Sequence, residues 1–181
     1  MSKQNQNVEQ ALRRIRRQFP DSEAVFNRVY ETMCRKANDR CNCDVPIPEW
    51  HVRVPGKFKY RCLRCRNVIS PLSVTPLGRQ HKDLTDTIEL ACRFYYKRRV
   101  LKPSEISQLY NCQYRTAMSQ SRRTLHWMKL AIMQNGDISE NISNTKVIRM
   151  FVSKHDDFTS AMDALFHALP SLGEAIEKSS K

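Results

Sequence analysis

Apolar residues recur every three or four positions in two stretches at the start of the chain, which predicts two amphipathic helices. The first stretch covers residues 7–19, and its apolar stripe is Val8, Leu12, Ile15 and Phe19. The second stretch starts after Pro20 and Asp21, which form a helix-start signal. Its stripe is Phe26, Val29, Tyr30 and Met33. Both stripes are interpreted as core, so residues 1–36 are expected to be two helices packed on each other.

The periodicity then changes. Residues 37–48 interrupt the helical pattern with Asn, Asp and two Pro residues, and from Trp50 to Ile69 aromatic and β-branched residues alternate with polar ones in places. Alternation of this kind around a Pro55-Gly56 dipeptide predicts short strands joined by a turn. Residues 37–75 are therefore expected to form a small β region.

Helical spacing returns after residue 80. A long helix is predicted over residues 82–99, with the stripe Leu84, Ile88, Ala91 and Tyr95. Pro103 opens a short helix that ends near residue 110. A tight connection at 111–112 leads into a longer helix from Gln113, so that residues 80–133 have the dimensions of a helix-turn-helix domain.

The polar stretch 134–145 contains an Asn-Gly dipeptide and is interpreted as a linker. Beyond it, residues 146–181 are expected to form a C-terminal helical extension. Its best amphipathic piece carries the stripe Phe158, Ala161, Met162, Leu165, Phe166 and Leu169. Two roles stay open for this stripe: contact with a second copy or a protein co-regulator, or a cap on the domain's own core. The predicted fold class is mainly α with a small β zinc ribbon, a helix-turn-helix domain and this extension.

The net charge of the chain and its distribution indicate what kind of partner it binds. The chain has 181 residues and a net charge of +13. Residues 1–134 hold 26 Lys and Arg against 11 Asp and Glu, whereas residues 135–181 hold 5 against 7. A basic body with a near-neutral tail favours a polyanion as partner, and a solubilising surface is the alternative. No apolar run is long enough to cross a bilayer and the start of the chain lacks a secretory apolar region, so a cytoplasmic protein without membrane contact is expected.

The cysteines add a candidate cofactor. Seven cysteines are present, three of them inside helix-like stretches, which argues against a disulfide framework. Cys62 and Cys65 form a CxxC that can hold one zinc ion, and Cys41 and Cys43, about 18 residues upstream, are the nearest candidates for the remaining two ligands. If the CxC cannot place both sulfurs on the metal, Cys34 and His51 are the substitutes.

Other roles for this CxxC are less consistent with its surroundings. Cys41 and Cys43 can be ordinary loop thiols with no metal bound. A redox CxxC sits between a strand and a helix, whereas this one is followed by another strand. A catalytic zinc needs an open coordination position, and four cysteines leave none. We therefore expect a structural zinc ion.

The predicted second helix of the helix-turn-helix begins with polar groups that can bond to base edges in the major groove. Arg115 can bond to guanine, Gln113 to adenine, and the methyl group of Thr116 can contact thymine. An ordinary helical hairpin remains the alternative. The expected double-stranded DNA contacts also include ribbon cations and further residues near phosphates. The full set is Lys57, Lys59, Arg61, Arg64, Arg66, Lys102, Gln113, Tyr114, Arg115, Thr116, Ser119, Arg122 and Arg123.

Three segments in this order, "RRQFPDSEAVFNRVYETM", "FKYRCLRCRNVISPLSVTPL" and "ISQLYNCQYRTAMSQSRRTL", resemble the N-terminal part of zinc-ribbon DDE transposases of bacterial insertion sequences. The resemblance covers about residues 15–130. It implies that Cys62 and Cys65 ligate zinc and that Gln113 to Thr116 open the recognition helix. The family has CxxC in its first knuckle, where this chain has Cys41-Asn-Cys43.

The family's catalytic RNase H-like domain should follow, but only 47 residues remain after residue 134, with a helical pattern. Asp156, Asp157 and Asp163 are interpreted as helix caps and a solvated helix face. The expected function is thus a transcriptional regulator, with activation slightly favoured, acting at the bacterial nucleoid or from a mobile element, and not an enzyme. A shortened transposase-type DNA-processing protein and an RNA-binding zinc-ribbon module are the alternatives.

Overall fold

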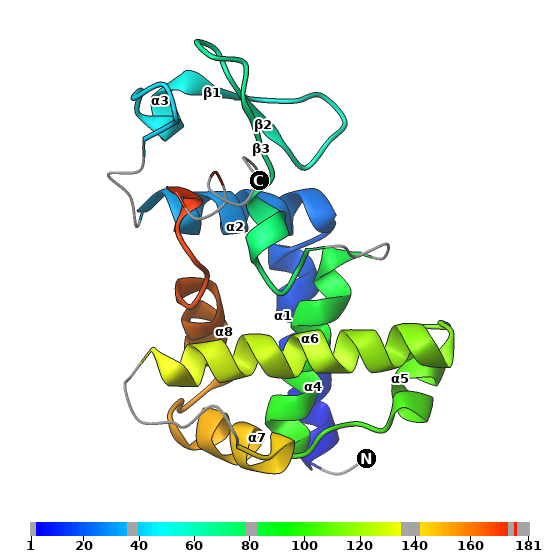
Figure 1. Ribbon diagram of the computed structural model, residues 1–181. Helices are drawn as coiled ribbons and strands as arrows, with labels where there is room; N and C mark the ends of the chain where they lie inside the picture. Colours follow the sequence, from blue (N-terminus) through cyan, green and yellow to red (C-terminus); the bar gives the residue numbers. More distant parts are fainter. Residues whose placement is uncertain (1–2, 36–39, 79–82, 135–141, 174–175, 177–181) are drawn as a thin grey trace.

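The computed structural model describes residues 3–35, 40–78, 83–134, 142–173 and 176. Figure 1 shows a body of helices with a small three-stranded sheet standing above it. The elements are, in chain order, α1 Lys3–Gln18, α2 Ser22–Arg35, α3 Ile47–Trp50, β1 His51–Arg53, β2 Tyr60–Cys62, β3 Val68–Ile69, the 3-10 helix η1 Pro71–Val74, α4 Leu84–Lys97, α5 Pro103–Leu109, α6 Tyr114–Met133, α7 Asn144–Ser153 and α8 Phe158–His167. The prediction of a mainly helical chain with a small β element is confirmed.

Helix α4 lies at the centre of the body and packs against α1, α2, α6, α7 and α8. Its buried residues run from Leu84 to Tyr95, and Asp83 caps it by accepting a hydrogen bond from the Thr85 N–H at 3.0 Å. Helix α1 packs along α4 with its predicted stripe of Val8, Leu12 and Ile15 buried. A salt bridge adds to this contact, since Arg16 donates to the nearly buried Glu89 at 2.6 Å.

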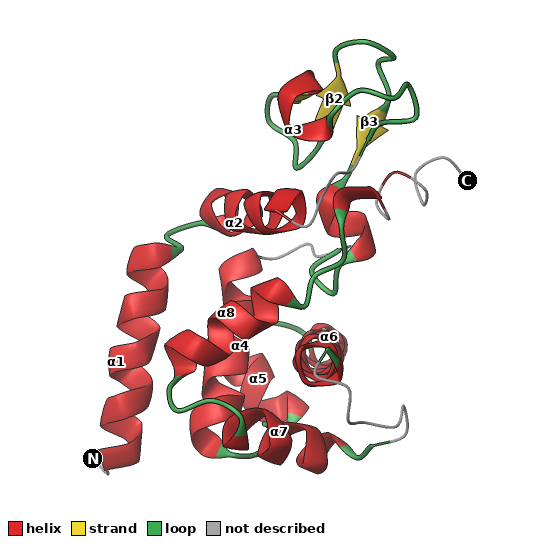
Figure 2. Ribbon diagram, turned by 90° about the vertical axis from the view of Figure 1, so that its left-hand side faces the viewer, coloured by secondary structure: helices red, strands yellow, loops and turns green. Residues whose placement is uncertain are grey.

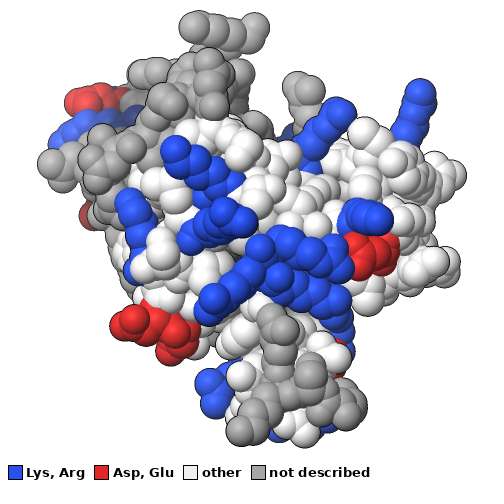
Figure 3. All heavy atoms as spheres, turned by 90° about the horizontal axis from the view of Figure 1, so that it is seen from below, with Lys and Arg blue, Asp and Glu red and all other residues white. Residues whose placement is uncertain are grey.

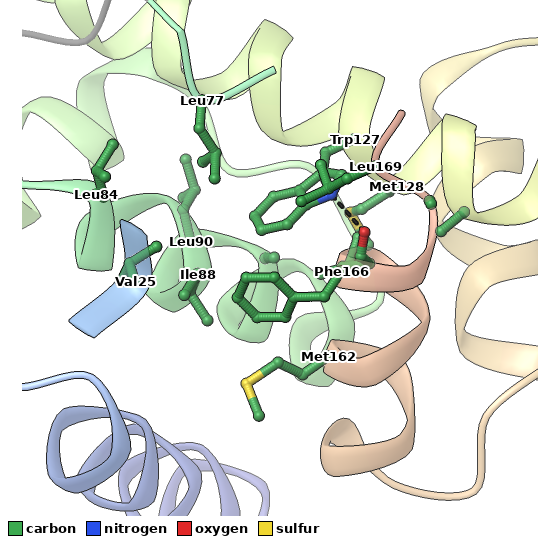
Figure 4. Packing of buried hydrophobic residues seen from close by; sticks show 14 of the residues in the cluster. Val25, Leu77, Leu84, Ile88, Leu90, Trp127, Met128, Met162, Phe166 and Leu169 are labelled. Atoms are coloured by element: carbon green, nitrogen blue, oxygen red, sulfur yellow. Dashed lines mark hydrogen bonds between the residues drawn. The ribbon is translucent and has the colours of Figure 1, made fainter. Parts of the chain in front are cut away.

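The core extends into the C-terminal helices (Figure 4). Trp127 of α6 is fully buried, and its indole N–H donates to the Leu165 carbonyl of α8 at 2.6 Å. The ring of Phe166 meets Trp127 edge to face, with centroids 5.4 Å apart, and also contacts Phe19. Helix α8 is therefore an integral layer of the body.

This arrangement decides between the two roles considered for the C-terminal apolar stripe. All its side chains belong to the chain's own core, where Leu165 and Leu169 are completely buried. Further contacts link these helices to the rest, because Arg28 of α2 pairs with Asp163 at 3.1 Å and the Tyr95 hydroxyl donates to the His155 carbonyl. A partner would have to contact other side chains of this segment.

The boundaries differ from the predicted ones in the β region and in the linker. The region 37–75 also contains the short helices α3 and η1, each with a Pro in its first turn, where strands and a turn were expected. Helix α7 begins at Asn144 inside the predicted linker 134–145, because the Ser143 hydroxyl caps it by accepting from the Lys146 N–H. Residues 135–141 of that linker lie outside the described residues.

The sheet has the order β1-β2-β3 and is antiparallel throughout. The turn between β1 and β2 is formed by Val54, Pro55, Gly56 and Lys57, with the Lys57 N–H donating to the Val54 carbonyl and with φ of +65° at Gly56. Positive φ at the third position of such a turn is what glycine allows at no steric cost. The strands and turn predicted for this region are thus present.

One face of the sheet is fixed to α2 by aromatic side chains. Tyr60 of β2 stacks on Tyr30 of α2 with ring centroids 3.8 Å apart, and Phe58 stacks on Phe26 at 5.1 Å. The guanidinium of Arg53 lies 4.1 Å from the Phe26 centroid and also pairs with Glu23. The sheet is therefore docked on the helical body.

Candidate metal centre and nucleic-acid interface

Four cysteine sulfurs meet at the end of the sheet farthest from the aromatic contact with α2. The sulfurs of Cys41, Cys43, Cys62 and Cys65 all lie within 4.8 Å of one another. Those of Cys41 and Cys65 are 3.4 Å apart, and those of Cys43 and Cys62 are 3.7 Å apart. Four ligand atoms at about 2.3 Å from one metal ion, arranged as a tetrahedron, are about 3.8 Å from each other. The cluster could therefore hold a metal ion.

Backbone geometry brings each cysteine pair together. The Arg66 N–H donates to the Cys62 carbonyl, and Arg66 has a positive φ of 64° that reverses the chain after Cys65. The upstream loop makes a similar turn in fewer residues, since the Asp44 N–H donates to the Cys41 carbonyl and Asp44 has φ of 63°. The CxC segment thus places both of its sulfurs in the cluster.

The electrostatics of the cluster differ from one thiol to the next. Burial alone would raise the pKa of Cys62, but the backbone N–H groups of Cys65 and Arg64 hydrogen-bond to its sulfur and lower that pKa to about 7. Burial raises the pKa of Cys41 to about 12, against one backbone N–H from Cys43. A bound cation would favour the thiolate form of all four.

The substitute ligands are not used in this arrangement. His51 lies beside Cys62 across the β1–β2 pair, but its Nδ1 contacts the Ile47 carbonyl at 3.0 Å, and neither it nor Cys34 belongs to the sulfur cluster. Burial lowers the pKa of His51. The four cysteines proposed from spacing are the set that the structure brings together.

The predicted ribbon cations lie around this cluster and along the β1–β2 turn. All are exposed: Lys57, Lys59, Arg61, Arg64 and Arg66. Among the described residues none of them pairs with a carboxylate, and Arg64 donates only to the Cys43 carbonyl at 3.2 Å. These charges are consequently available to an external anion.

The second group of predicted contacts lies on α6. Gln113, Tyr114 and Arg115 are exposed at its N-terminal end, and Ala117 is buried as expected, in the same core as Ile106 of α5. Of the other predicted contacts on this helix, Arg122 is exposed. Three more are half-buried: Thr116, Ser119 and Arg123. Arg115, Arg122 and Arg123 have no carboxylate partner in the described part of the chain.

A third basic region lies at the opposite end of the molecule from the sheet, where Figure 3 shows Lys and Arg side chains gathered on one face. The segment that joins α4 to α5 lies at this end and exposes Arg98, Arg99 and the predicted contact Lys102. Arg99 pairs with Glu105 at 2.7 Å, which leaves Arg98 and Lys102 without a carboxylate partner among the described ion pairs.

Two of the three acidic residues named in the C-terminal segment, Asp157 and Asp163, have structural partners. Asp157 caps α8 by accepting from the Ser160 N–H at 2.8 Å, and Asp163 pairs with Arg28. Both contacts agree with their interpretation as a helix cap and a solvated helix face.

Sequence patterns did not single out Arg53 or the exposed side chain of Trp50. Arg53 appeared as one cation among many, and only the positions of the Phe26 ring of α2 and of the rings of Phe58 and Tyr60 show that it is an anchor. The alternation of β1 could have indicated Trp50, because it places residues 50 and 52 on the face opposite His51.

Comparison with protein-family models, curated proteins and solved structures finds no match. No helix within the described ranges combines the length and the apolar content that crossing a bilayer requires.

Proposed function

We propose that this chain is a sequence-specific DNA-binding transcriptional regulator, built on a structural zinc ribbon and a helix-turn-helix formed by α5 and α6. The observation that carries the proposal is the exposed, uncompensated end of α6. There Gln113, Tyr114 and Arg115 face solvent on a helix whose other side is fixed in the core by Ala117 and Trp127.

Zinc is the metal that fits the cysteine cluster best. Soft thiolate ligands in a tetrahedral arrangement select zinc or an iron–sulfur centre, and a lone ion with four thiolates is the usual structural zinc site. With four protein ligands no coordination position stays open for water or substrate. The ion would therefore fold the ribbon and hold its cations in place.

The dimensions of α5 and α6 fit a helix-turn-helix. Helix α5 spans Pro103–Leu109, four residues connect it to α6, and the two helices pack closely. In this motif the second helix enters the major groove with its N-terminal residues on the base edges. Arg115 would donate two hydrogen bonds to guanine, while Arg122, about two turns farther along the same face of the helix, would contact a phosphate.

The ribbon would add phosphate contacts beside the groove. In Figure 1 the β1–β2 turn and the N-terminal end of α6 both lie on the right-hand side of the molecule. Cations at both places can contact one extended polyanion, and each phosphate neutralised contributes to the salt dependence of binding.

The test is selection of duplex DNA by the purified, zinc-loaded chain from a library with a randomised core. Enrichment of one motif supports the proposal. Arg115→Ala should then relax the preference at one position by about 1–3 kcal/mol, and Arg64→Ala should weaken binding to all sequences and reduce the salt slope by about one.

Arg13→Ala is the matched control, because Arg13 is an exposed arginine of α1 and Figure 2 shows α1 and α6 on opposite sides of the body. The proposal fails if no motif is enriched, or if single-stranded RNA competes with duplex DNA on equal terms and Arg115→Ala changes nothing. The latter result would favour an RNA-binding zinc-ribbon module.

Activation is the regulatory direction we favour, since the near-neutral C-terminal segment leaves solvent-facing side chains for polymerase or a co-regulator. A reporter gene placed behind the selected motif distinguishes activation from repression by the sign of its change when the chain is expressed.

A further inference from the structure

The sheet of the ribbon has a second face that no described element covers. Cross-strand register places Trp50 opposite Leu63 and Val52 opposite Arg61, whereas His51 and Cys62 point to the other side. Trp50 is 40% exposed, Val52 45% and Leu63 46%. We call these four residues, Trp50, Val52, Arg61 and Leu63, the outer face.

This outer face is unusual within the molecule. Large hydrophobic side chains exposed to this degree are few in the described chain, and three of them lie here together. Figures 1 and 2 show the sheet above the helical body with the short helix α3 beside it, and its inner side contacts α2. These side chains form a small platform with one aromatic ring beside an arginine, and not the broad apolar patch of a protein–protein interface.

The backbone of Trp50 is held by main-chain hydrogen bonds on both sides of the residue. Its N–H donates to the Pro46 carbonyl at 3.2 Å, and its carbonyl accepts from the Leu63 N–H at 2.8 Å. Trp50 is thus the last residue of α3, and its carbonyl also accepts a hydrogen bond from the segment that follows β2. Because the backbone is already ordered, only the two side-chain torsions of Trp50 lose freedom when a flat ligand stacks on its ring.

The size of the outer face limits what can bind there. Two paired strands of about four residues each span on the order of 150 Å² at about 3.3 Å per residue and about 4.8 Å between strands. A stable protein–protein interface needs about 800 Å² on each side. The area that one large aromatic ring buries is about 150–250 Å², which is the scale of this face.

The positive charge around the outer face distinguishes between a second copy of the chain and a phosphate-bearing ligand. Arg61 lies within the face, and the exposed Arg64 and Arg66 follow in the next loop. A two-fold contact with a second copy would bring these cations against themselves. A phosphate-bearing ligand with a flat apolar group is favoured instead, because an aromatic platform beside backbone-tracking cations is how proteins hold single strands.

We propose that the outer face binds single-stranded nucleic acid, stacking an unpaired base on Trp50 while Arg61 contacts the adjoining phosphate. The proposal deepens the proposed function and rests on it in taking the chain to bind nucleic acid. It adds a second ligand geometry, an unpaired strand, on a surface separate from α6.

Tryptophan fluorescence tests this directly, because the chain has two tryptophans and Trp127 is fully buried. Titration of the zinc-loaded full chain with an eight-nucleotide oligothymidylate should quench the emission of Trp50 in a saturable manner. Trp50→Leu should remove the quenching and weaken binding of the labelled oligonucleotide by about 5-fold to 100-fold. Arg61→Ala should weaken it and lower the salt slope by about 0.7.

Leu109→Ala is the control, since Leu109 is as exposed as Leu63 but lies on α5. Metal content and circular dichroism of each variant establish that it is folded. The proposal is overturned if folded Trp50→Leu binds the oligonucleotide like the wild type, or if blunt duplex quenches Trp50 as strongly as the single strand. It is also overturned if the chain dimerises in sedimentation and Trp50→Leu abolishes the dimer.

The two proposals can fail separately. Arg115→Ala should relax duplex selection and leave the quenching by oligothymidylate intact, whereas Trp50→Leu should do the reverse. Loss of duplex selection with intact quenching would overturn only the proposed sequence-specific function.

Discussion

Removal of the metal should unfold only the distal half of the ribbon. The cysteine cluster forms a small core of its own, separate from the main one, and among the described residues Val45 is the single other apolar side chain buried in it. Burying one Val stabilises by about 1.5–3 kcal/mol. Ordering the roughly dozen residues of 40–46 and 62–67 costs on the order of 10 kcal/mol or more. A metal ion bound by the four cysteines would supply the difference, since metal binding is worth about 10–16 kcal/mol at structural zinc sites.

The proximal half of the ribbon has other contacts. Phe58 and Tyr60 stack on rings of α2, and Ile69 is fully buried in the main core. These contacts do not depend on the cysteines. We therefore expect the β1–β2 turn and the helical body to keep their structure without metal.

Hydrogen–deuterium exchange measures the cysteine loops and the helical body in one experiment. After chelation under reducing conditions, peptides from 40–46 and 62–67 should lose their protection, while peptides from α2, α4 and α6 keep theirs. Cys43→Ser should weaken metal binding, and Cys34→Ser, outside the cluster, should not. The reasoning would be refuted if segments 40–46 and 62–67 stayed protected in protein shown to be metal-free. It would also be refuted if the helical body lost its protection together with them.

Three further predictions concern the helical body and its junction with the ribbon. Arg53→Ala should destabilise the docking of the sheet by about 1–2 kcal/mol, seen as faster exchange in β1 and β2, because it removes a cation from between aromatic rings. Hydrogen bonds from Arg99 and the Lys102 N–H lower the pKa of Glu105 to about 2 from its ordinary 4.5, so this pair stabilises above pH 4.5 and is lost as the pH falls towards 2. In urea unfolding Glu105→Gln should cost about 1 kcal/mol at pH 7, a value reduced for solvent screening, and almost nothing near pH 2. Phe166→Ala should cost about 3–5 kcal/mol in the same assay, whereas Asp156→Ala should stay within about 0.5.

The spacing of apolar residues was sufficient to predict the helices, but it could not predict which elements pack against each of them. The stripes of α1, α2 and α4 are buried as expected because a wide apolar face has to be covered whatever covers it. For the same reason, the sequence could not decide whether the apolar stripe around Phe166 contacts a partner or packs on the chain's own core. Only the position of Trp127, far away in sequence, resolves it, since its indole N–H reaches a carbonyl of α8.

The cysteine site shows a similar limit. Spacing identified the four cysteines that meet in the structure, yet it could not establish that a CxC loop brings both sulfurs to one point. That depends on the backbone of Asp44, whose left-handed conformation is adopted by Asp and Asn more readily than by most residues. The identity of residue 44 is thus as informative as the cysteines that precede it.

The docking of the ribbon has a consequence for any ligand that contacts both the ribbon and α6. Helix α2 holds the sheet through Phe26 and Tyr30, and the same helix packs against α4 and α8. Helix α6 packs against α4 and α8 as well, so the ribbon and the exposed end of α6 are connected through two shared layers and not through a linker. A DNA site bound by both is therefore expected to have a fixed spacing between its two contacted parts, because changing that spacing would require repacking the core around Trp127 and Phe166.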